Sequence, residues 1–94
     1  MRIAAKIDNN QRAIIATLRS AGASVMVLSG VGHGCPDLLV GYHGHDALAE
    51  VKDKRGKLTP DQIVWHRRWR GRPVRIVRTC MDAVKMLNEI TEGG

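Results

Sequence analysis

Apolar side chains are spaced along this chain in two ways, at helical intervals in some segments and in short runs in others. Ile14, Leu18 and Ala21 recur every three or four positions, which places them on one face of a helix. Asp8 can cap that helix, and Gln11 stands where the second side chain of a capping box would reach back. We therefore predict an amphipathic helix from Asp8 to Ala21.

Two later segments also carry the features of a helix start. Thr59 can cap a helix, Pro60 suits its first position, and Gln62 completes a capping box. This helix is predicted to run to about Arg70, because Gly71 stops it. A last helix is predicted after Thr79, with an apolar face made of Val84, Leu87 and Ile90 or Thr91.

Short apolar runs bounded by glycine, proline or polar turn residues predict β-strands. Such runs occur at residues 24–28, 37–42, 47–52 and 74–78. A polar turn at 43–46 joins the second and third runs into a predicted hairpin, and the glycine-rich segment 29–34 is predicted to be a loop. The order helix, strand, strand, strand, helix, strand, helix predicts an α/β protein of the mixed α+β type, with a central mixed sheet flanked by helices.

Length and composition narrow the class of protein. A chain of 94 residues is expected to form one domain, so 1–94 is treated as a single unit. No apolar run approaches the roughly 20 residues of a membrane span, and residues 1–8 lack the apolar stretch of a signal peptide. Cys35 and Cys80 match no metal or disulfide pattern. We therefore expect a cytoplasmic protein with reduced thiols and no membrane partner.

Basic residues are concentrated in one segment of the chain. Residues 52–78 contain ten Lys and Arg against two Asp, a net charge of +8, whereas the whole chain carries +6. The rest of the chain is therefore slightly acidic. A basic segment on a balanced body predicts a polyanionic partner, most simply nucleic acid, although a solvated basic surface has the same composition.

The predicted hairpin brings two acids and a lysine together. Side chains alternate across a strand, so Glu50 and Lys52 point to one face and Val51 points to the other, into the core. Because the two strands run antiparallel, Asp37 at the start of one lies beside the end of the next. The side chains of Asp37, Glu50 and Lys52 are therefore expected to converge. An exposed cross-strand charge pair between Glu50 and Lys52 is the plainer alternative.

These groups suit divalent-metal chemistry on a phosphodiester. Two carboxylates are enough protein ligands for Mg²⁺, which keeps water and substrate oxygens as its other ligands. The carbonyl oxygen of Val51 is a further hard ligand. A bound ion polarises a phosphate and acidifies a bound water, and Lys52 can neutralise charge that develops in the transition state. The sequence thus indicates metal-dependent phosphodiester hydrolysis as the working hypothesis.

The same residues form a recognisable motif. Pro36-Asp37 followed by Glu50-Val51-Lys52 resembles the Pro-Asp…(Asp/Glu)-x-Lys signature of the PD-(D/E)xK nuclease superfamily. With Gly34-Cys35 before it and Leu58-Thr59-Pro60-Asp61-Gln62 after it, the chain is similar to the VRR-NUC family within that superfamily. The resemblance spans nearly the whole chain, from the first helix to the strand at 74–77.

The resemblance implies a restriction-endonuclease-like αβββαβ core, here followed by a C-terminal helix. It also implies Mg²⁺- or Mn²⁺-dependent endonuclease activity on DNA. Members that consist of the nuclease domain alone, often phage-encoded, resemble Holliday junction resolvases and act as homodimers. The implied partners are therefore branched or junction DNA and a second copy of the chain, and the implied location is the cytoplasm, or the host cytoplasm if a phage encodes the protein.

The resemblance also implies roles for single residues. Asp37 and Glu50 match the metal ligands, Lys52 the catalytic lysine, and Gln62 the glutamine that faces the active site. The family usually carries a glutamate in the first helix as an additional metal ligand, and this chain has Gln11 there. An amide oxygen is a weaker ligand for Mg²⁺ than a carboxylate, and Gln11 is equally well explained as a capping-box residue. Asp8, one turn earlier, is the other candidate.

Candidate DNA contacts lie on both sides of this motif. Those that follow Lys52 closely are expected to border the active site: Lys54, Arg55 and Lys57. Arg67 and Arg68, on the predicted second helix, can contact phosphates. His33 in the glycine-rich loop lies near the acids and can touch substrate. On the same predicted helix, Trp65 and Trp69 share one face, and at least one of them is expected to pack onto the sheet.

Two other functions are compatible with the sequence. One is a non-catalytic nucleic-acid-binding module with a basic face, in which the acids are structural. The other is a small interaction protein whose basic face docks on an acidic protein. No base-reading motif is visible, so a DNA-binding role predicts recognition of shape or structure.

Overall fold

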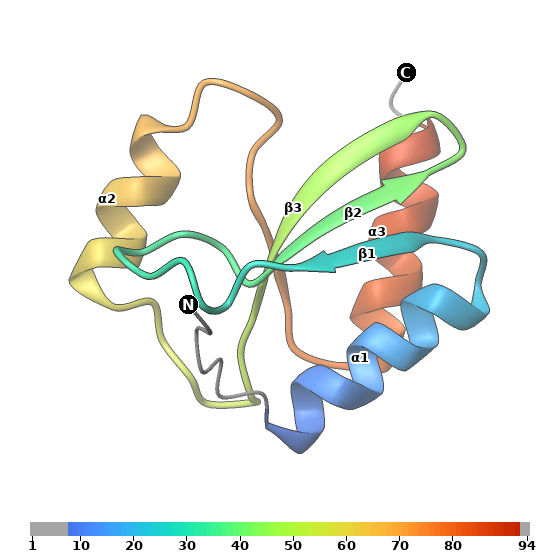
Figure 1. The fold of residues 1–94 in the computed structure, drawn as a ribbon, viewed down its shortest axis with the longest axis horizontal. Coiled ribbons are helices and arrows are strands. Elements are labelled where there is room, and N and C mark those ends of the chain that lie inside the picture. The colour runs from blue at the N-terminus through green and yellow to red at the C-terminus, as the bar shows by residue number, and fades with distance from the viewer. Residues whose placement is uncertain (1–7, 93–94) are drawn as a thin grey trace.

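The computed structural model describes residues 8–92, and its element order is the predicted one (Figure 1). The expectation about a signal peptide at residues 1–8 lies almost wholly outside the described residues. The elements are α1 (Asn9–Ser20), β1 (Ser24–Val27), β2 (Leu38–Tyr42), β3 (His45–Val51), α2 (Pro60–Arg68), β4 (Arg75–Val77) and α3 (Cys80–Glu92). No helix within residues 8–92 is long and apolar enough to cross a bilayer.

The strands form one mixed sheet in the order β1-β2-β3-β4. β1 pairs antiparallel with β2, β2 pairs antiparallel with β3, and β3 pairs parallel with β4. The last pairing is parallel because the chain leaves the sheet after β3, forms α2 and returns in the same direction. This mixed α+β arrangement confirms the predicted fold class.

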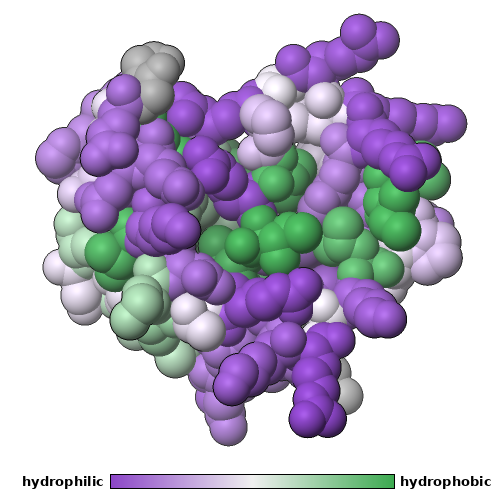
Figure 2. All heavy atoms as spheres, turned by 180° about the vertical axis from the view of Figure 1, so that it is seen from behind, coloured by the Kyte–Doolittle hydropathy of each residue, from purple (hydrophilic) through white to green (hydrophobic). Residues whose placement is uncertain are grey.

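Helices α1 and α3 lie together on one face of the sheet, whereas α2 stands apart from them (Figure 1). The core fills the layer between the sheet and the α1–α3 pair. Its members come from every element except β1 and α2, together with the residue before β1: Ile14, Ile15, Leu18, Ala23, Leu38, Val40, Ala47, Ala49, Val77, Ala83, Met86, Leu87 and Ile90. By contrast, α2 contains no buried residue. On the rear surface a central band of apolar atoms lies between hydrophilic side chains (Figure 2).

The hairpin is tighter than the sequence suggested. β3 begins at His45, two residues before the predicted start, so only His43 and Gly44 form the turn. Their φ angles are +49° and +81°. A two-residue turn with both φ angles positive matches the twist of the flanking strands and fixes their register.

The face of α1 differs in detail from the prediction. Ala21 is exposed at the end of α1, where it serves as the C-cap, and Ile15 takes its place beside Ile14 and Leu18. The helix therefore buries two neighbouring isoleucines on the side that faces the sheet and α3.

The other two helices also differ from the prediction, α3 in its buried face and α2 in its C-terminal end. In α3, Val84 is 42% exposed, and the buried residues are instead Ala83, Met86, Leu87 and Ile90. The prediction for Val84 is wrong because α3 packs against both α1 and the sheet, which widens and rotates its buried stripe. α2 ends earlier than predicted, at Arg68, with Trp69 in an extended conformation as its C-cap.

Candidate active site

The hairpin places the carboxylates of Asp37 and Glu50 side by side. Leu38 pairs with Ala49 across the two strands, so Asp37, directly before Leu38, lies next to the Glu50–Val51 segment. One oxygen of Asp37, Oδ2, accepts a hydrogen bond of 2.8 Å from the Val51 amide. Its other oxygen, Oδ1, accepts one of 3.3 Å from the Ser29 hydroxyl. The orientation of Asp37 is thus fixed by the backbone of the strand that carries Glu50.

Glu50 is a buried acid on the sheet face opposite the core. Its side chain is only 1% exposed. Oε2 accepts a 3.2 Å hydrogen bond from the Gln62 amide, and Oε1 lies 3.3 Å from Nε2 of His66. Burial first and the nearby Asp37 carboxyl second raise the pKa of Glu50 to about 9, and Lys52 opposes the shift. A buried acid of this kind stays protonated at neutral pH until a positive charge compensates it.

The alternative of an exposed charge pair between Glu50 and Lys52 is wrong, because Glu50 is buried. Val51 packs against the core from the other face of β3, as strand alternation predicted. Lys52 follows the end of the strand, and its backbone amide donates to the Val77 carbonyl. Its positive charge acts on both Glu50 and His66.

The ammonium of Lys52 is not committed to one acid. Among the described residues, the acids with a basic nitrogen within 4.0 Å are Glu50, whose partner is the neutral imidazole of His66, and Glu89, whose partner is Arg75. Lys52 therefore contributes its charge to the site from a longer distance, which leaves the ammonium available to a phosphate.

Gln11 points toward the site and is buried, with an exposed fraction of 5%. Its side-chain amide donates a 2.8 Å hydrogen bond to Ser29, which in turn donates to Asp37. The predicted capping box is only half formed, since Asp8 accepts from the Gln11 backbone but the Gln11 side chain is used by Ser29. Asp8 is thus engaged as the N-cap, and Gln11 is the α1 residue that reaches the acid pair.

Gln62 connects α2 to the other acid of the pair, Glu50. Its Oε1 accepts from the Thr59 amide, which completes the predicted capping box, while its Nε2 donates to Glu50. The local capping motif therefore aims the amide at the active-site carboxylate.

The glycine-rich loop packs against the start of α2. Gly34, at a φ of +85°, lies so close to this helix that a Cβ atom would overlap the backbone of Asp61. Only glycine fits this approach, because the conformation and the space both exclude a side chain. The loop thereby helps to hold α2 over the end of β3, where Gln62 meets Glu50.

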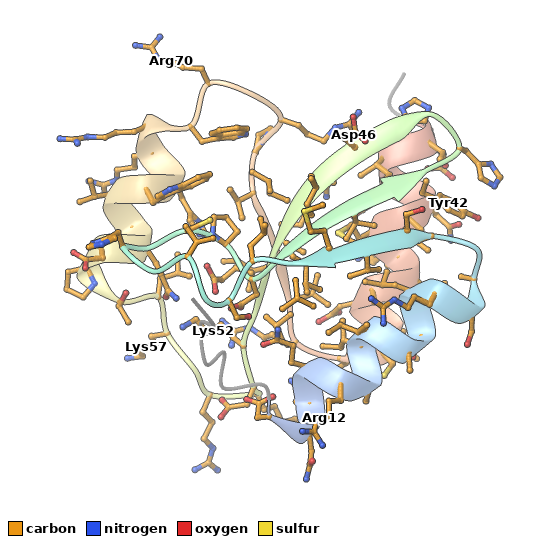
Figure 3. The ribbon with its side chains drawn as sticks, in the orientation of Figure 1. Arg12, Tyr42, Asp46, Lys52, Lys57 and Arg70 are labelled. Atoms are coloured by element: carbon orange, nitrogen blue, oxygen red, sulfur yellow. The ribbon has the colours of Figure 1, made fainter. Side chains whose placement is uncertain are left out.

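The predicted DNA contacts lie around this centre. Those on the connection from β3 to α2 are exposed, and we call this connection the basic loop (residues 53–57): Lys54, Arg55 and Lys57. Figure 3 shows Lys52 where the chain leaves β3 and Lys57 farther along. Arg67 and Arg68 are exposed on α2, and His33 is exposed on the glycine-rich loop with a φ of +56°.

Arg78 has a different role from the other basic residues of this segment. Its guanidinium donates to the carbonyls of Asp53 and Gly56 at 2.7 Å each. These two hydrogen bonds tie the basic loop to the end of β4. Arg78 therefore holds the loop that carries the predicted DNA contacts.

Sequence reasoning missed three residues at the site. His66 contacts Glu50, and Ser29 links Gln11 to Asp37. The Asn10 amide donates to the carbonyls of Lys52 and Arg78, which joins the ends of β3 and β4. Of these three, only His66 could have been predicted from the sequence, because it lies four positions after Gln62 and thus on the same face of the helix. Burial and the charge of Lys52 lower the pKa of His66, so its imidazole is held neutral.

The donor set fits a hard divalent cation. Among the described residues no group of three or more His, Cys, Asp or Glu side chains is arranged to hold a metal. Asp37 and Glu50 provide two converging carboxylates, and Mg²⁺ is typically held by one or two carboxylates, with water and substrate oxygens as its other ligands. Burial and, after it, the Asp37 carboxyl raise the pKa of Glu50, and Lys52 offsets this only in part, so a cation at the two carboxylates would favour the ionised acid.

The fold and the site together define the class of protein, a restriction-endonuclease-like domain of nuclease type. A search of solved structures finds a chain described as a VRR-NUC domain, with 32% sequence identity and a TM-score of 0.68. The match covers 83% of this chain and 89% of that chain. The protein therefore belongs to the VRR-NUC family, which confirms the resemblance seen in its motifs. Scans against protein-family models and curated proteins give no match.

Proposed function

We propose that this protein is a Mg²⁺- or Mn²⁺-dependent DNA endonuclease that hydrolyses phosphodiester bonds. The observation that carries the proposal is the convergence of Asp37 and buried Glu50 beside Lys52. Burying Glu50 beside a second, half-buried carboxylate costs stability, because a charge removed from water is poorly solvated, and this cost points to a functional use of the two acids. Membership of the VRR-NUC family supports a nuclease as that use.

Asp37, Glu50, the Val51 carbonyl and the Gln11 amide would hold the cation. When bound, the ion would polarise the scissile phosphate and lower the pKa of a water. Gln62 and His66 orient the Glu50 carboxylate through their contacts with its two oxygens. Lys52 supplies a positive charge that can stabilise the phosphate as negative charge develops on it. In this assignment Gln62 acts by positioning Glu50.

DNA would lie across the face that carries the basic loop and α2. The basic loop directly follows Lys52 along the chain, and Arg67 and Arg68 add exposed positive charge on α2. Contacts of this kind bind phosphates and position a strand without reading its sequence. His33 would approach the same strand from the glycine-rich loop.

The proposed substrate is branched or junction DNA, cut by a homodimer. No base-reading motif is visible in the sequence, which favours recognition of DNA shape. Cutting a four-way junction symmetrically needs two active sites on opposed strands, and a two-fold dimer supplies them. The proposed compartment is the cytoplasm.

Cleavage of labelled four-way junction, flap and duplex DNA in Mg²⁺ or Mn²⁺ tests the proposal. We expect junction DNA to be cut fastest by the wild type, and activity to be lost in Asp37→Asn, Glu50→Gln and Lys52→Ala. Asp46→Asn, an exposed acid at the far end of the hairpin, is the matched control and should cut normally (Figure 3). Cleavage of no substrate by the wild type, or equal cleavage by the Glu50→Gln variant, would refute the catalytic assignment.

Calorimetry with Mn²⁺ separates catalysis from plain DNA binding. The wild type and Asp46→Asn should bind the ion, whereas Asp37→Asn should not. A protein that binds DNA but shows no difference in Mn²⁺ binding between these variants is a nucleic-acid-binding module. Sedimentation at micromolar concentration tests the dimer independently.

A further inference from the structure

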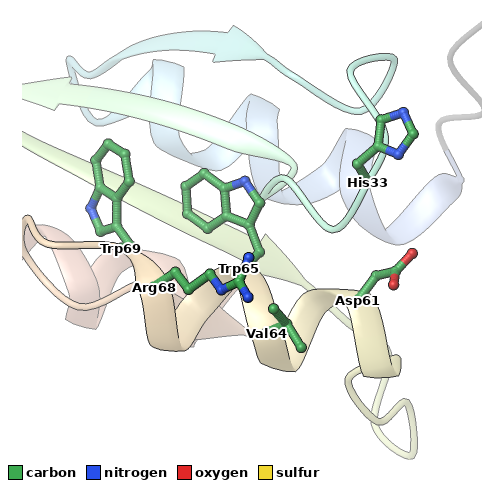
Figure 4. Close-up of a pocket in the computed structure, with 6 residues that line it drawn as sticks. All are labelled: His33, Asp61, Val64, Trp65, Arg68 and Trp69. Atoms are coloured by element: carbon green, nitrogen blue, oxygen red, sulfur yellow. The ribbon is translucent and has the colours of Figure 1, made fainter.

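A cavity of about 460 Å³ lies beside α2. It is lined by His33, Asp61, Val64, Trp65, Arg68 and Trp69 (Figure 4). This volume falls within the roughly 300–1,000 Å³ typical of small-molecule pockets. All of these residues except His33 come from α2 and its C-cap, and His33 comes from the glycine-rich loop.

Two tryptophans form a stacked pair in this cavity. The ring centroids of Trp65 and Trp69 are 5.0 Å apart, and the ring planes differ by 16°. Trp69 is 45% exposed, and α2 has no buried residue, so this pair does not belong to the core. Trp69 also lines a second pocket together with Leu39 and Leu48 of the sheet, so it lies between α2 and the sheet without being buried.

The stacked pair adjoins the candidate active site. The Trp65 ring lies 6.5 Å from the imidazole of His66, measured between centroids, and His66 contacts Glu50. Gln62 and His66 line one face of α2, and Trp65 and Trp69 line the neighbouring face. A DNA strand whose phosphate lies at Glu50 therefore has an adjacent nucleotide within reach of the tryptophans.

We propose that Trp65 and Trp69 form a stacking platform for an unpaired nucleobase next to the cleaved phosphate. Every base has a π-face, so stacking on an indole holds a base without reading its identity. Arg68 can neutralise the phosphate of that nucleotide, and Asp61 can accept a hydrogen bond from a base amino group. This inference rests on the proposed function, and it explains how the enzyme would favour branched DNA over plain duplex, because a base beside a branch point unstacks more easily than one inside a duplex.

Binding experiments in EDTA test the platform without cleavage. The probes are two duplexes that each contain a short single-stranded gap, identical except that one carries abasic sites in the gap. We expect the base-bearing probe to bind about 5- to 100-fold more tightly and to quench tryptophan fluorescence. Trp65 and Trp69 are the chain's two tryptophans, so the signal reports this site directly.

Variants locate the effect. Trp69→Ala should lose most of the preference for the base-bearing probe, whereas Trp69→Phe should keep much of it. Tyr42→Ala changes an aromatic residue at the far end of the hairpin and should bind as the wild type does (Figure 3). Equal binding of the two probes by the wild type, or an unchanged preference in Trp69→Ala, would overturn the platform.

A second outcome concerns dimerisation. If Trp69→Ala dissociates a wild-type dimer and the preference for bases is unaffected, the tryptophans form a subunit interface and the platform is refuted. The platform and the nuclease proposal can fail separately. If the wild-type protein cleaves DNA but binds both probes equally, only the platform is refuted. If the wild-type protein is inactive but prefers the base-bearing probe, only the catalytic assignment is refuted.

Discussion

The buried acid Glu50 makes a specific prediction about stability. Glu50→Gln keeps the size of the side chain and its ability to contact Gln62 and His66, but it removes the charge. We expect this substitution to inactivate the enzyme and yet to stabilise the metal-free protein above neutral pH. The reason is that burial and Asp37 raise the pKa of Glu50 from 4.5 to about 9.

The size of the effect follows from proton linkage. An acid with a higher pKa in the folded state binds more protons when folded, so the free energy of unfolding falls as pH rises between the two pKa values. For Glu50 this window runs from 4.5 to about 9. pH 7 lies about 2.5 pH units above the lower end of this window. At about 1.36 kcal/mol per unit, the free energy of unfolding at pH 7 is lowered by roughly 3 kcal/mol. A domain of this size shifts its Tm by roughly 4–8 °C per kcal/mol.

Thermal denaturation at pH 5 and pH 8, in EDTA and in Mn²⁺, measures this effect. In EDTA the wild type should lose stability from pH 5 to pH 8, by about 4 kcal/mol through Glu50, and the Tm of Glu50→Gln should fall by at least about 15 °C less. Mn²⁺ should restore the wild type at pH 8 by binding its folded state, and should leave the variant unchanged. Asp46→Asn controls for general charge effects. A variant with the same pH dependence as the wild type would refute the reasoning.

Three further changes test how the site is held. Gly34→Ala forces a side chain against the start of α2 at a φ of +85°, so we expect its free energy of unfolding to fall by roughly 1–3 kcal/mol. The control is Gly44→Ala, at a φ of +81° but with nothing within 4 Å, which should lose less. Equal losses in the two variants would contradict the packing argument. Arg78→Met removes two hydrogen bonds to the basic loop, so amide exchange in that loop should accelerate and DNA binding should weaken; unchanged exchange would count against this role. Burial raises the pKa of the Cys35 thiol, and the neighbouring carboxylates of Glu50 and Asp37 add to the shift. Alkylation of Cys35, measured in Cys80→Ser protein, should therefore be slow, and it should be faster with Mn²⁺. The absence of a Mn²⁺ effect would argue against a metal at these acids.

The sequence predicted the parts of the site that depend on local geometry. Strand alternation placed Glu50 and Val51 on opposite faces of β3, and the capping motif placed Gln62 at the start of α2. These two features depend on neighbours along the chain, so periodicity and capping chemistry were enough to find them. The hairpin itself was predicted, but its turn was placed at 43–46, and the tighter two-residue turn that sets the register between Asp37 and Glu50 appears only in the structure.

The sequence did not predict contacts that depend on packing between distant segments. The Gln11 side chain leaves its own helix terminus because Ser29, eighteen positions away, offers a partner at 2.8 Å. The burial of Glu50 could not be read from its polar character, because it results from α2 lying over the end of β3. The same placement explains why His66 was missed, since its partner lies sixteen positions away.

The candidate site is divided between a rigid part and a helix that the core does not hold. Asp37 and Glu50 lie on the central strands of the sheet or directly beside them, whereas α2 contributes no buried residue. α2 is tied to the sheet through Glu50, which contacts both Gln62 and His66. Ionisation of Glu50 strengthens its hydrogen bonds to those two residues, because a charged acceptor binds donors more strongly. Metal binding, which favours the ionised acid, should therefore also fix α2 and the tryptophan pair that it carries.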